Sequence, residues 1–236
     1  MEKKNKSSNI IQVGILVVLI VIAFLLGALL DKKTSNYVPT DSQEVSSDTQ
    51  DEVVPSETNE EIAIRLGMSK EEFNNCVSSA DIEKKVNDQA NSGVKSGVSG
   101  TPGNFLLDTQ TGKAVELGGA VPLATLKSEF EKLKSGSGTS ISIDPVTSED
   151  FVKGNVNARY VLMEWSDFDC PYCKTFQDTA NAFIKENEDV RWVYRQFPLD
   201  FHPTAMSKSI AALCAGKIGG NAMFWAFAEE LMAQGE

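Results

Sequence analysis

A pair of cysteines directly after an apolar segment constrains the fold of this chain most. Residues 160–166, YVLMEWS, are largely apolar and predict a buried strand. Cys170, Pro171 and Cys173 follow, and a proline in this place favours the first turn of a helix. The sequence therefore predicts a strand that leads through a short turn into a helix, with both sulfur atoms near the start of that helix.

The start of a helix is a position that activates a cysteine. Free backbone N–H groups and the positive end of the helix dipole stabilise the thiolate there. We expect Cys170 to be the exposed nucleophile and Cys173, one turn on, the sheltered cysteine that closes a disulfide with it. Glu164 lies on the predicted strand, and a buried carboxylate is costly unless it has a task. Our hypothesis is that Glu164 shuttles a proton for Cys173.

The N-terminal segment indicates the compartment. Residues 10–30 form an uncharged apolar run about as long as a bilayer is thick, and three lysines precede it. The positive-inside rule places residues 1–9 in the cytoplasm and the rest of the chain after residue 30 outside. A cleaved signal peptide is the alternative, but its apolar region would be shorter and would end at small residues. We expect a single-pass anchor in the cell membrane and an extracytoplasmic domain.

A Cys-x-x-Cys pair has two other interpretations. A zinc site usually needs two close pairs of ligands, whereas Cys76 and Cys214 are isolated and His202 is the single histidine. The sequence therefore predicts no metal site, and a structural role for His202 at a helix start. An inert structural disulfide is the second alternative, and the position after a strand in an exported chain favours redox chemistry over it.

Composition separates a tether from a folded domain. Residues 31–59 are rich in Ser, Thr, Asp, Glu, Gln and Pro, which predicts a disordered linker. Residues 60–236 carry apolar residues at helical and strand spacings, which predicts one α/β domain. The 22 basic and 33 acidic residues give a net charge of −11, which argues against binding nucleic acid.

A Gly- and Ser-rich stretch, residues 135–140, predicts a flexible joint between two halves of this domain. The first half, residues 60–134, predicts three helices, a hairpin around TQTGK and a fourth helix. The third helix is expected to end at Gly93. The second half, residues 141–236, predicts a short strand over ISID at residues 141–144, and then two longer strands that alternate with helices.

Several segments resemble the DsbA-like thiol–disulfide oxidoreductases of the thioredoxin superfamily. VLMEWSDFDCPYCKTFQ resembles the active-site strand and helix of that family, and GVSGTPGNFLLD resembles its cis-proline loop. YRQFPLDFHPTAMSKSIAALCA and LGMSKEEFNNCVSS resemble parts of its inserted helical subdomain and the strand before it. The resemblance implies a thioredoxin-like α/β fold with an inserted helical subdomain. It also implies that Cys170 is the nucleophile, Cys173 the resolving cysteine and Glu164 the buried acid.

The resemblance further assigns a substrate-docking loop to Thr101 and Pro102. The bond between them would be cis, the proline would lie against the active-site disulfide, and the Thr101 backbone would pair with an incoming peptide strand. Phe168 and Tyr172 flank the cysteines. They are expected either to form an apolar rim for substrate peptides or to pack internally.

The order of the two halves departs from the family pattern, in which the CPYC half comes first and the cis-proline loop last. One explanation is a circular permutation, with the joint connecting the old termini and new termini opened inside the helical subdomain. The other is a fusion of two incomplete domains, which would need to exchange halves between chains to bury their sheets. We favour the permutation because the halves are complementary without overlap.

Cys76 and Cys214 lie on predicted amphipathic helices, one in each half. They are either two buried free cysteines or, outside the cell, a second disulfide, which some DsbA-like proteins carry in the helical subdomain. We expect the Cys76–Cys214 disulfide, because it would tie together the helices on either side of the proposed new termini.

The leading functional hypothesis is a membrane-anchored enzyme, without a bound cofactor, that introduces disulfides into exported proteins with free thiols. A membrane partner of the DsbB or quinone-linked type would reoxidise it. A disulfide reductase or isomerase is the alternative, since the reduction potential sets the direction. A non-catalytic module that holds peptides beside Pro102 is the third hypothesis.

Overall fold

The computed structural model describes residues 56–234, which form one compact unit. The predicted cytoplasmic segment (residues 1–9), the predicted anchor (residues 10–30) and the predicted linker up to residue 55 lie outside the described residues. The remainder of that linker is short, because the first described helix begins at Asn59.

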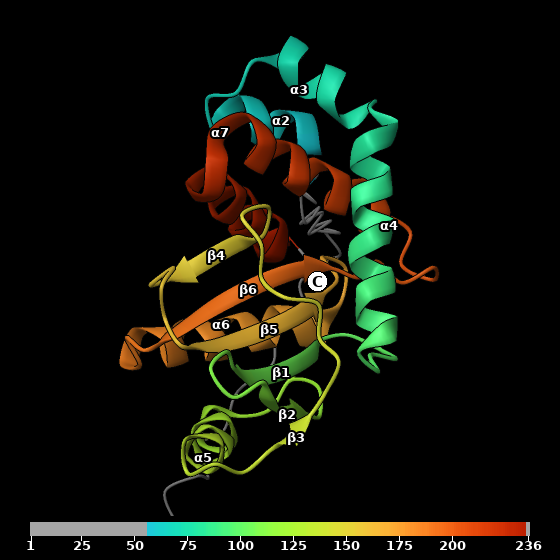
Figure 1. Cartoon of the computed structure of the whole chain (residues 1–236). Helices are drawn as coiled ribbons and strands as arrows, with labels where there is room; N and C mark the ends of the chain where they lie inside the picture. Colours follow the sequence, from blue (N-terminus) through green and yellow to red (C-terminus); the bar gives the residue numbers. More distant parts are fainter. Residues whose placement is uncertain (1–55, 235–236) are drawn as a thin grey trace, which may run out of the picture. The chain divides into compact units, whose positions relative to one another are not determined.

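Each half of the domain supplies both helices and strands (Figure 1). The first half contains α2 (Asn59–Arg65), α3 (Lys70–Val77), α4 (Ala80–Lys95), β1 (Gly103–Asp108), β2 (Lys113–Leu117) and α5 (Leu123–Lys134). The second half contains β3 (Thr139–Ser140), β4 (Phe151–Gly154), β5 (Tyr160–Ser166), α6 (Pro171–Glu186), β6 (Val190–Gln196) and α7 (Ala205–Gln234). The hairpin, the two longer strands and the helices agree with the predictions from the sequence.

Both halves contribute to one six-stranded sheet, with strand order β3-β2-β1-β5-β6-β4. β1 of the first half pairs antiparallel with β5 of the second half, from Gly103 opposite Trp165 to Asp108 opposite Tyr160. β5 and β6 run parallel and are connected through α6. The halves are therefore joined at the centre of the sheet within a single molecule. This mixed sheet with helices is consistent with the predicted thioredoxin-like fold.

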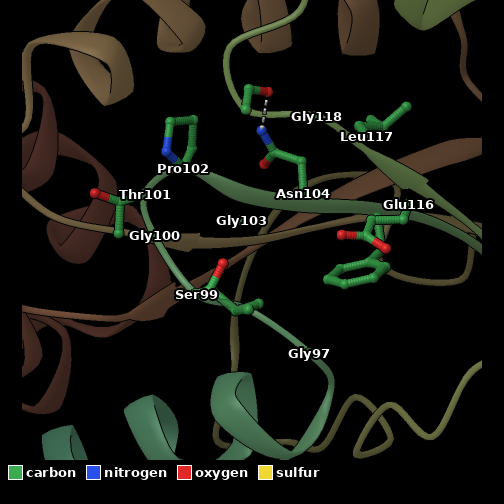
Figure 2. Close-up of a pocket in the computed structure, with 13 residues that line it drawn as sticks. Gly97, Ser99, Gly100, Thr101, Pro102, Gly103, Asn104, Glu116, Leu117 and Gly118 are labelled. Atoms are coloured by element: carbon green, nitrogen blue, oxygen red, sulfur yellow. Dashed lines mark hydrogen bonds between the residues drawn. The ribbon is translucent and has the colours of Figure 1, made fainter.

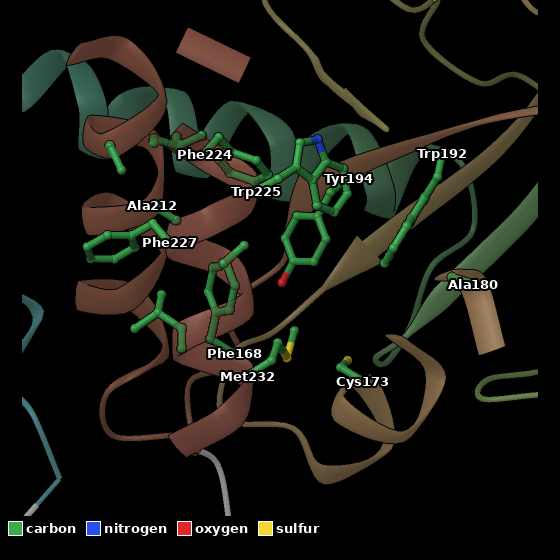
Figure 3. Close-up of a cluster of buried hydrophobic side chains, with 14 of the residues drawn as sticks. Phe168, Cys173, Ala180, Trp192, Tyr194, Ala212, Phe224, Trp225, Phe227 and Met232 are labelled. Carbon is green, nitrogen blue, oxygen red and sulfur yellow. The ribbon is translucent and has the colours of Figure 1, made fainter. Parts of the chain in front are cut away.

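Apolar clusters cover both faces of the sheet. On one face, α6 and α7 pack against side chains such as Trp192 and Tyr194 of β6, and α5 packs against β1 and β2. Figure 3 shows part of this cluster, where Phe224 and Trp225 of α7 lie close to Tyr194. On the other face, α4 and the chain after β3 pack near Trp165. Because both faces are covered, β5 is buried along its whole length, as is usual for parallel central strands.

The helices α2, α3, α4 and α7 gather beyond one edge of the sheet (Figure 1). The Cys76–Cys214 disulfide connects α3 with α7, so the pairing expected from the sequence is present. The rings of Phe73 and Phe227 pack nearby with their centroids 5.9 Å apart. This helical layer thus contains segments from both halves of the chain.

Within the described residues, α7 is the one helix whose length and apolar composition would suffice to cross a bilayer. It is interrupted at Gly220, where φ is 76° and the backbone leaves the helical region. Phe224 and Leu231 of α7 belong to the buried apolar cluster. The apolar character of α7 therefore reflects its position in the core of the domain.

One predicted strand is absent, and one strand was not predicted. Residues 141–144 form no strand, and the short strand β3 lies instead at the end of the predicted joint, where Thr139 pairs with Ala114. Ile141 and Ile143 pack onto the core. The Arg195 guanidinium donates hydrogen bonds to the backbone carbonyl oxygens of Asp144 and Pro145. β4, which forms the other edge of the sheet, was not predicted.

Gly93 does not end α4, which continues to Lys95. A Cβ atom at Gly93 would lie 2.7 Å from the Trp165 ring and 2.9 Å from the Phe197 ring. The glycine is therefore required by the close approach of α4 to the sheet, and not by a turn of the backbone.

Candidate active site

The cysteine pair lies where the sequence predicts it, at the start of α6. Cys170 is the N-cap residue, Pro171 is in the first turn, and Cys173 follows one turn on. Both cysteines are free thiols in this structure, and their exposed fractions are 5% and 0%. Cys170 is thus the more accessible sulfur of a nearly closed site.

The peptide bond between Thr101 and Pro102 is cis, as the resemblance implied. This loop leads directly into β1, which pairs with β5, and β5 leads to the cysteines. Sγ of Cys170 lies 3.5 Å from the carbonyl oxygen of Thr101. A loop of the first half and a cysteine of the second half therefore form one site.

The surroundings of Cys170 stabilise its thiolate. Its pKa is lowered to about 5, and the side chain of Cys173 is the largest cause. The side chain of Thr101 and the backbone N–H groups at the start of α6 lower the pKa further, against the opposing effect of burial. Cys170 is consequently a thiolate at neutral pH.

The net pKa shifts of Cys173 and Glu164 are in the opposite direction, because burial is the largest cause there. Burial raises the pKa of the Cys173 thiol well above its ordinary value, with a contribution from the Glu164 charge. Burial also raises the pKa of Glu164, to about 7. One oxygen of Glu164 accepts a hydrogen bond from Nε1 of Trp192 at 2.9 Å. The arrangement combines a nucleophilic outer thiolate with an inner thiol and a carboxyl group that titrates near neutral pH.

A groove of about 330 Å³ lies beside the cis-proline loop. It is lined by residues 97–105 and by residues 116–119 at the end of β2. Figure 2 shows Asn104 in this groove, with its side-chain amide donating to the carbonyl oxygen of Gly119 at 3.1 Å. The groove includes Thr101, whose carbonyl oxygen contacts Cys170.

The two aromatic residues expected at the rim differ in position. Tyr172 is 68% exposed and is available to contact a substrate. Phe168 is 1% exposed and its ring stacks on that of Tyr194, with centroids 5.3 Å apart. The expectation of a substrate contact is therefore wrong for Phe168, because the turn before α6 directs its ring into the core.

The structure adds two aspartates that the sequence did not single out. The buried Asp167 carboxylate accepts from the backbone N–H of Leu199 and contacts Nδ1 of His202, both at 2.8 Å. Asp169 accepts hydrogen bonds from Thr204 and pairs with Lys208 at 2.6 Å. His202 therefore contacts the turn before Cys170, which is compatible with the structural role expected from the sequence. The two aspartates connect the turn before Cys170 to the loop after β6. In the sequence, only their position next to CPYC could have indicated this role.

Two family models match this chain, on opposite sides of the joint. The DSBA-like thioredoxin domain matches residues 43–131, and the family described as Thioredoxin matches residues 146–236. The crystal structure of Pseudomonas aeruginosa DsbA2 matches 39% of this chain and 50% of that chain, with 28% sequence identity and a TM-score of 0.36.

Curated relatives are similar over a shorter part of the chain. The Na⁺/H⁺ antiporter NhaA 1 of Salinispora arenicola is 35% identical over 98 residues, which are 41% of this chain and 14% of the antiporter. The NhaA 1 antiporter of Mycolicibacterium vanbaalenii is 36% identical over 88 residues, which are 35% of this chain and 13% of that protein. The matched region thus spans about one seventh of the length of these relatives.

Proposed function

Since the chain is a DsbA-like protein of the thioredoxin superfamily, we propose that it uses Cys170 and Cys173 to introduce disulfides into exported proteins. The family supports a thiol–disulfide oxidoreductase that meets protein substrates and redox partners. The direction of the reaction is our proposal. The observation that carries it is the stabilised thiolate of Cys170, whose pKa is about 5. A stabilised thiolate favours the reduced enzyme, and an enzyme with a stable reduced form is a strong oxidant.

The proposed reaction has two exchanges. A substrate thiolate attacks Sγ of Cys170, the Cys170–Cys173 bond breaks, and Cys173 leaves as the thiolate. A second substrate thiolate then attacks the substrate sulfur of the mixed disulfide. This step forms the substrate disulfide and releases the Cys170 thiolate. A membrane partner of the DsbB or quinone-linked type would then remove two electrons from the cysteine pair, together with the one proton that Cys173 carries while Cys170 is a thiolate.

Substrate peptides would bind beside the cis-proline loop. Thr101 and Pro102 lie at the groove described above, and the carbonyl oxygen of Thr101 is close to Cys170. An extended substrate segment would pair with the Thr101 backbone. Tyr172, which is exposed beside the reactive sulfur, would provide an apolar contact.

Trapping of a mixed disulfide tests this function. Cys173→Ser should accumulate a covalent complex between Cys170 and exported proteins, because the thiol that releases a trapped substrate is missing. Cys170→Ser should form no such complex and should lose all activity. A Cys170→Ser variant that keeps its function in cells would instead support the non-catalytic peptide-binding module.

We also propose that residues 10–30 anchor the enzyme, with the domain outside the cell membrane and residues 1–9 inside. The uncharged length of this segment and the preceding lysines support this topology. Protease added to intact spheroplasts should digest the domain. In a separate sample without protease, the protein should stay in the membrane fraction after an alkaline wash. A released protein that lacks residues 1–30 would indicate a cleaved signal peptide.

The reversed order of the halves supports a circular permutation. Residues 56–59 and Gln234 line the same pocket, so the chain segments at the proposed new termini lie close together. The two family matches also fall on opposite sides of the joint. A reordered chain, with residues 141–236 linked to residues 60–134, should fold to a monomer with the same disulfide. Failure of the reordered chain to fold would contradict the permutation.

A further inference from the structure

Proton supply to the inner cysteine is a problem that this site must solve. In the exchange proposed above, on which this inference rests, Cys173 leaves as a thiolate and must take up a proton. Cys173 is fully buried, and Glu164 is 1% exposed. Neither group can exchange a proton with bulk water directly. A proton that moves between Glu164 and Cys173 must therefore pass through groups inside the protein.

The strands place two hydroxyl groups at this point. Side chains alternate along β5, so Ser166 projects to the same face as Glu164, the face that α6 covers. β6 lies parallel to β5 with Tyr194 directly opposite Glu164. Figure 3 shows the Tyr194 hydroxyl pointing into the region between Phe168 and Cys173.

In the described part of the chain these buried hydroxyl groups have no partner at full hydrogen-bond geometry, although Ser166 lies close enough to Glu164, Cys173 and Tyr194 to shift their pKa. The atoms concerned are Oγ of Ser166 and the phenolic oxygen of Tyr194. An unsatisfied buried hydroxyl costs about 1–3 kcal/mol. The indole of Trp192 already binds Glu164, but it is a donor only and cannot pass a proton on. A hydroxyl can accept one proton while it donates another, which is the property that a relay requires.

We propose that Ser166 relays a proton between Glu164 and Cys173, and that Tyr194 positions the Ser166 hydroxyl. When the Cys170–Cys173 bond breaks, the Cys173 sulfur keeps the electron pair. The hydroxyl proton of Ser166 passes to this sulfur, and the carboxylic proton of Glu164 passes to the Ser166 oxygen. Cys173 becomes a thiol, Glu164 a carboxylate, and Ser166 is unchanged. The reverse transfer deprotonates Cys173 when it attacks a mixed disulfide.

The electrostatics of the cluster agree with this path. Burial raises the pKa of Glu164, Cys173 and Tyr194, and the Ser166 side chain lowers the pKa of all three. The Ser166 hydroxyl therefore lies near each of the groups between which it would act. The other ionisable groups that face this cluster are Cys170 from α6 and Asp167 from the turn before it.

The test separates the step at Cys173 from the step at Cys170. The full-length protein is prepared as a mixed disulfide between Cys170 and glutathione, and the release of glutathione by Cys173 is followed from pH 5 to pH 9. Alkylation of the reduced protein by iodoacetamide reports on Cys170 alone. The variants are Ser166→Ala and Tyr194→Phe. Ser209→Ala is the matched control, because Ser209 is also fully buried with an unpartnered Oγ, on α7.

We expect Ser166→Ala to slow glutathione release by about a hundredfold, the lower end of the range for proton-transfer catalysis. The step in its pH profile near pH 7, where Glu164 titrates, should disappear. Tyr194→Phe should have a smaller effect in the same direction. Alkylation of Cys170 should stay within about twofold for these variants, and Ser209→Ala should match the wild type in both assays.

A purely structural role of Ser166 predicts that Ser166→Ala leaves glutathione release unchanged, since removal of an unsatisfied hydroxyl leaves the fold at least as stable. Glutathione release by Ser166→Ala at the wild-type rate and with the wild-type pH profile would overturn the relay. Equal slowing of release and alkylation would also overturn it. A wild-type protein that forms no mixed disulfide at all would instead contradict the proposed function, so the two failures are distinguishable.

Discussion

Sγ of Cys170 and the carbonyl oxygen of Thr101 lie 3.5 Å apart, although 69 positions separate the two residues in the sequence. This contact depends on the pairing of β1 with β5, which brings the start of one strand beside the end of the other. The reactive sulfur therefore belongs to the second half of the chain, and part of its environment belongs to the first half. Neither half contains the complete site.

Removal of the Thr101 hydroxyl should weaken the thiolate. Thr101→Val keeps the backbone and the side-chain volume but deletes a group that lowers the pKa of Cys170. We expect the pKa of Cys170 to rise from about 5, and the thiolate to become a weaker leaving group in the mixed disulfide. Ultraviolet absorbance of the thiolate across pH measures the change. An unchanged pKa would show that Thr101 acts through its backbone alone.

The reduced protein should gain stability over the oxidised protein as pH rises. The Cys170 thiol has a pKa of about 5 in the folded state and about 8.5 in an unfolded chain. A lowered folded pKa contributes stability that is complete above the unfolded pKa and is lost as pH falls through the folded pKa. The disulfide form has no such titration.

Denaturant unfolding of both redox forms checks this dependence. The difference in the free energy of unfolding should grow by roughly 1.4 kcal/mol per pH unit between about pH 5 and pH 8.5. Cys173 does not change the sign in this window, because burial keeps it protonated in the folded state and an ordinary thiol pKa of about 8.5 keeps most of it protonated in the unfolded chain. A difference that is constant across the window would contradict the stabilised thiolate.

Loss of the second disulfide should destabilise the domain without changing the reactivity of Cys170. The Cys76–Cys214 bond closes a loop of 138 residues between the two halves. Replacement of both cysteines by alanine should cost about 2–5 kcal/mol of unfolding free energy, while iodoacetamide should alkylate Cys170 at the wild-type rate.

Mass mapping of the non-reduced protein is the direct check of the pairing. It should find peptides of Cys76 linked to peptides of Cys214. A link between Cys76 residues of two molecules would support exchange of halves between chains.

A methyl group at Gly93 should not fit between α4 and the sheet. Alanine favours a helix over glycine by about 1 kcal/mol, but its Cβ would lie 2.7 Å from the Trp165 ring. We expect Gly93→Ala to destabilise the protein by about 1–3 kcal/mol and to change its tryptophan fluorescence. Gly118→Ala is the control, because a Cβ there meets no atom within 4 Å. Equal stability of the two variants would contradict this packing.

Local patterns in the sequence predicted much of the site. The apolar strand β5, the proline after Cys170 and the hairpin between β1 and β2 are each specified by neighbouring residues. The contact of the cis-proline loop with Cys170 came from the resemblance to a family, since no local pattern shows which distant loop will meet a given strand.

The failures of prediction have a common physical cause. Ile141 and Ile143 alternate like a strand, but Arg195, distant in sequence, binds the carbonyl groups that follow them. Asp167 looks like an ordinary turn residue until the loop after β6 supplies donors to its carboxylate. Each of these outcomes depends on partners that lie more than thirty positions away.

The reduction potential of the Cys170–Cys173 couple decides whether the protein donates disulfides or reduces them. Equilibration of the full-length protein with glutathione buffers of known ratio, followed by alkylation and mass analysis, gives its value. A donor of disulfides with a strongly stabilised thiolate should have a potential near about −120 mV. A potential of about −270 mV, typical of thioredoxin, would contradict disulfide donation and assign the chain to disulfide reduction.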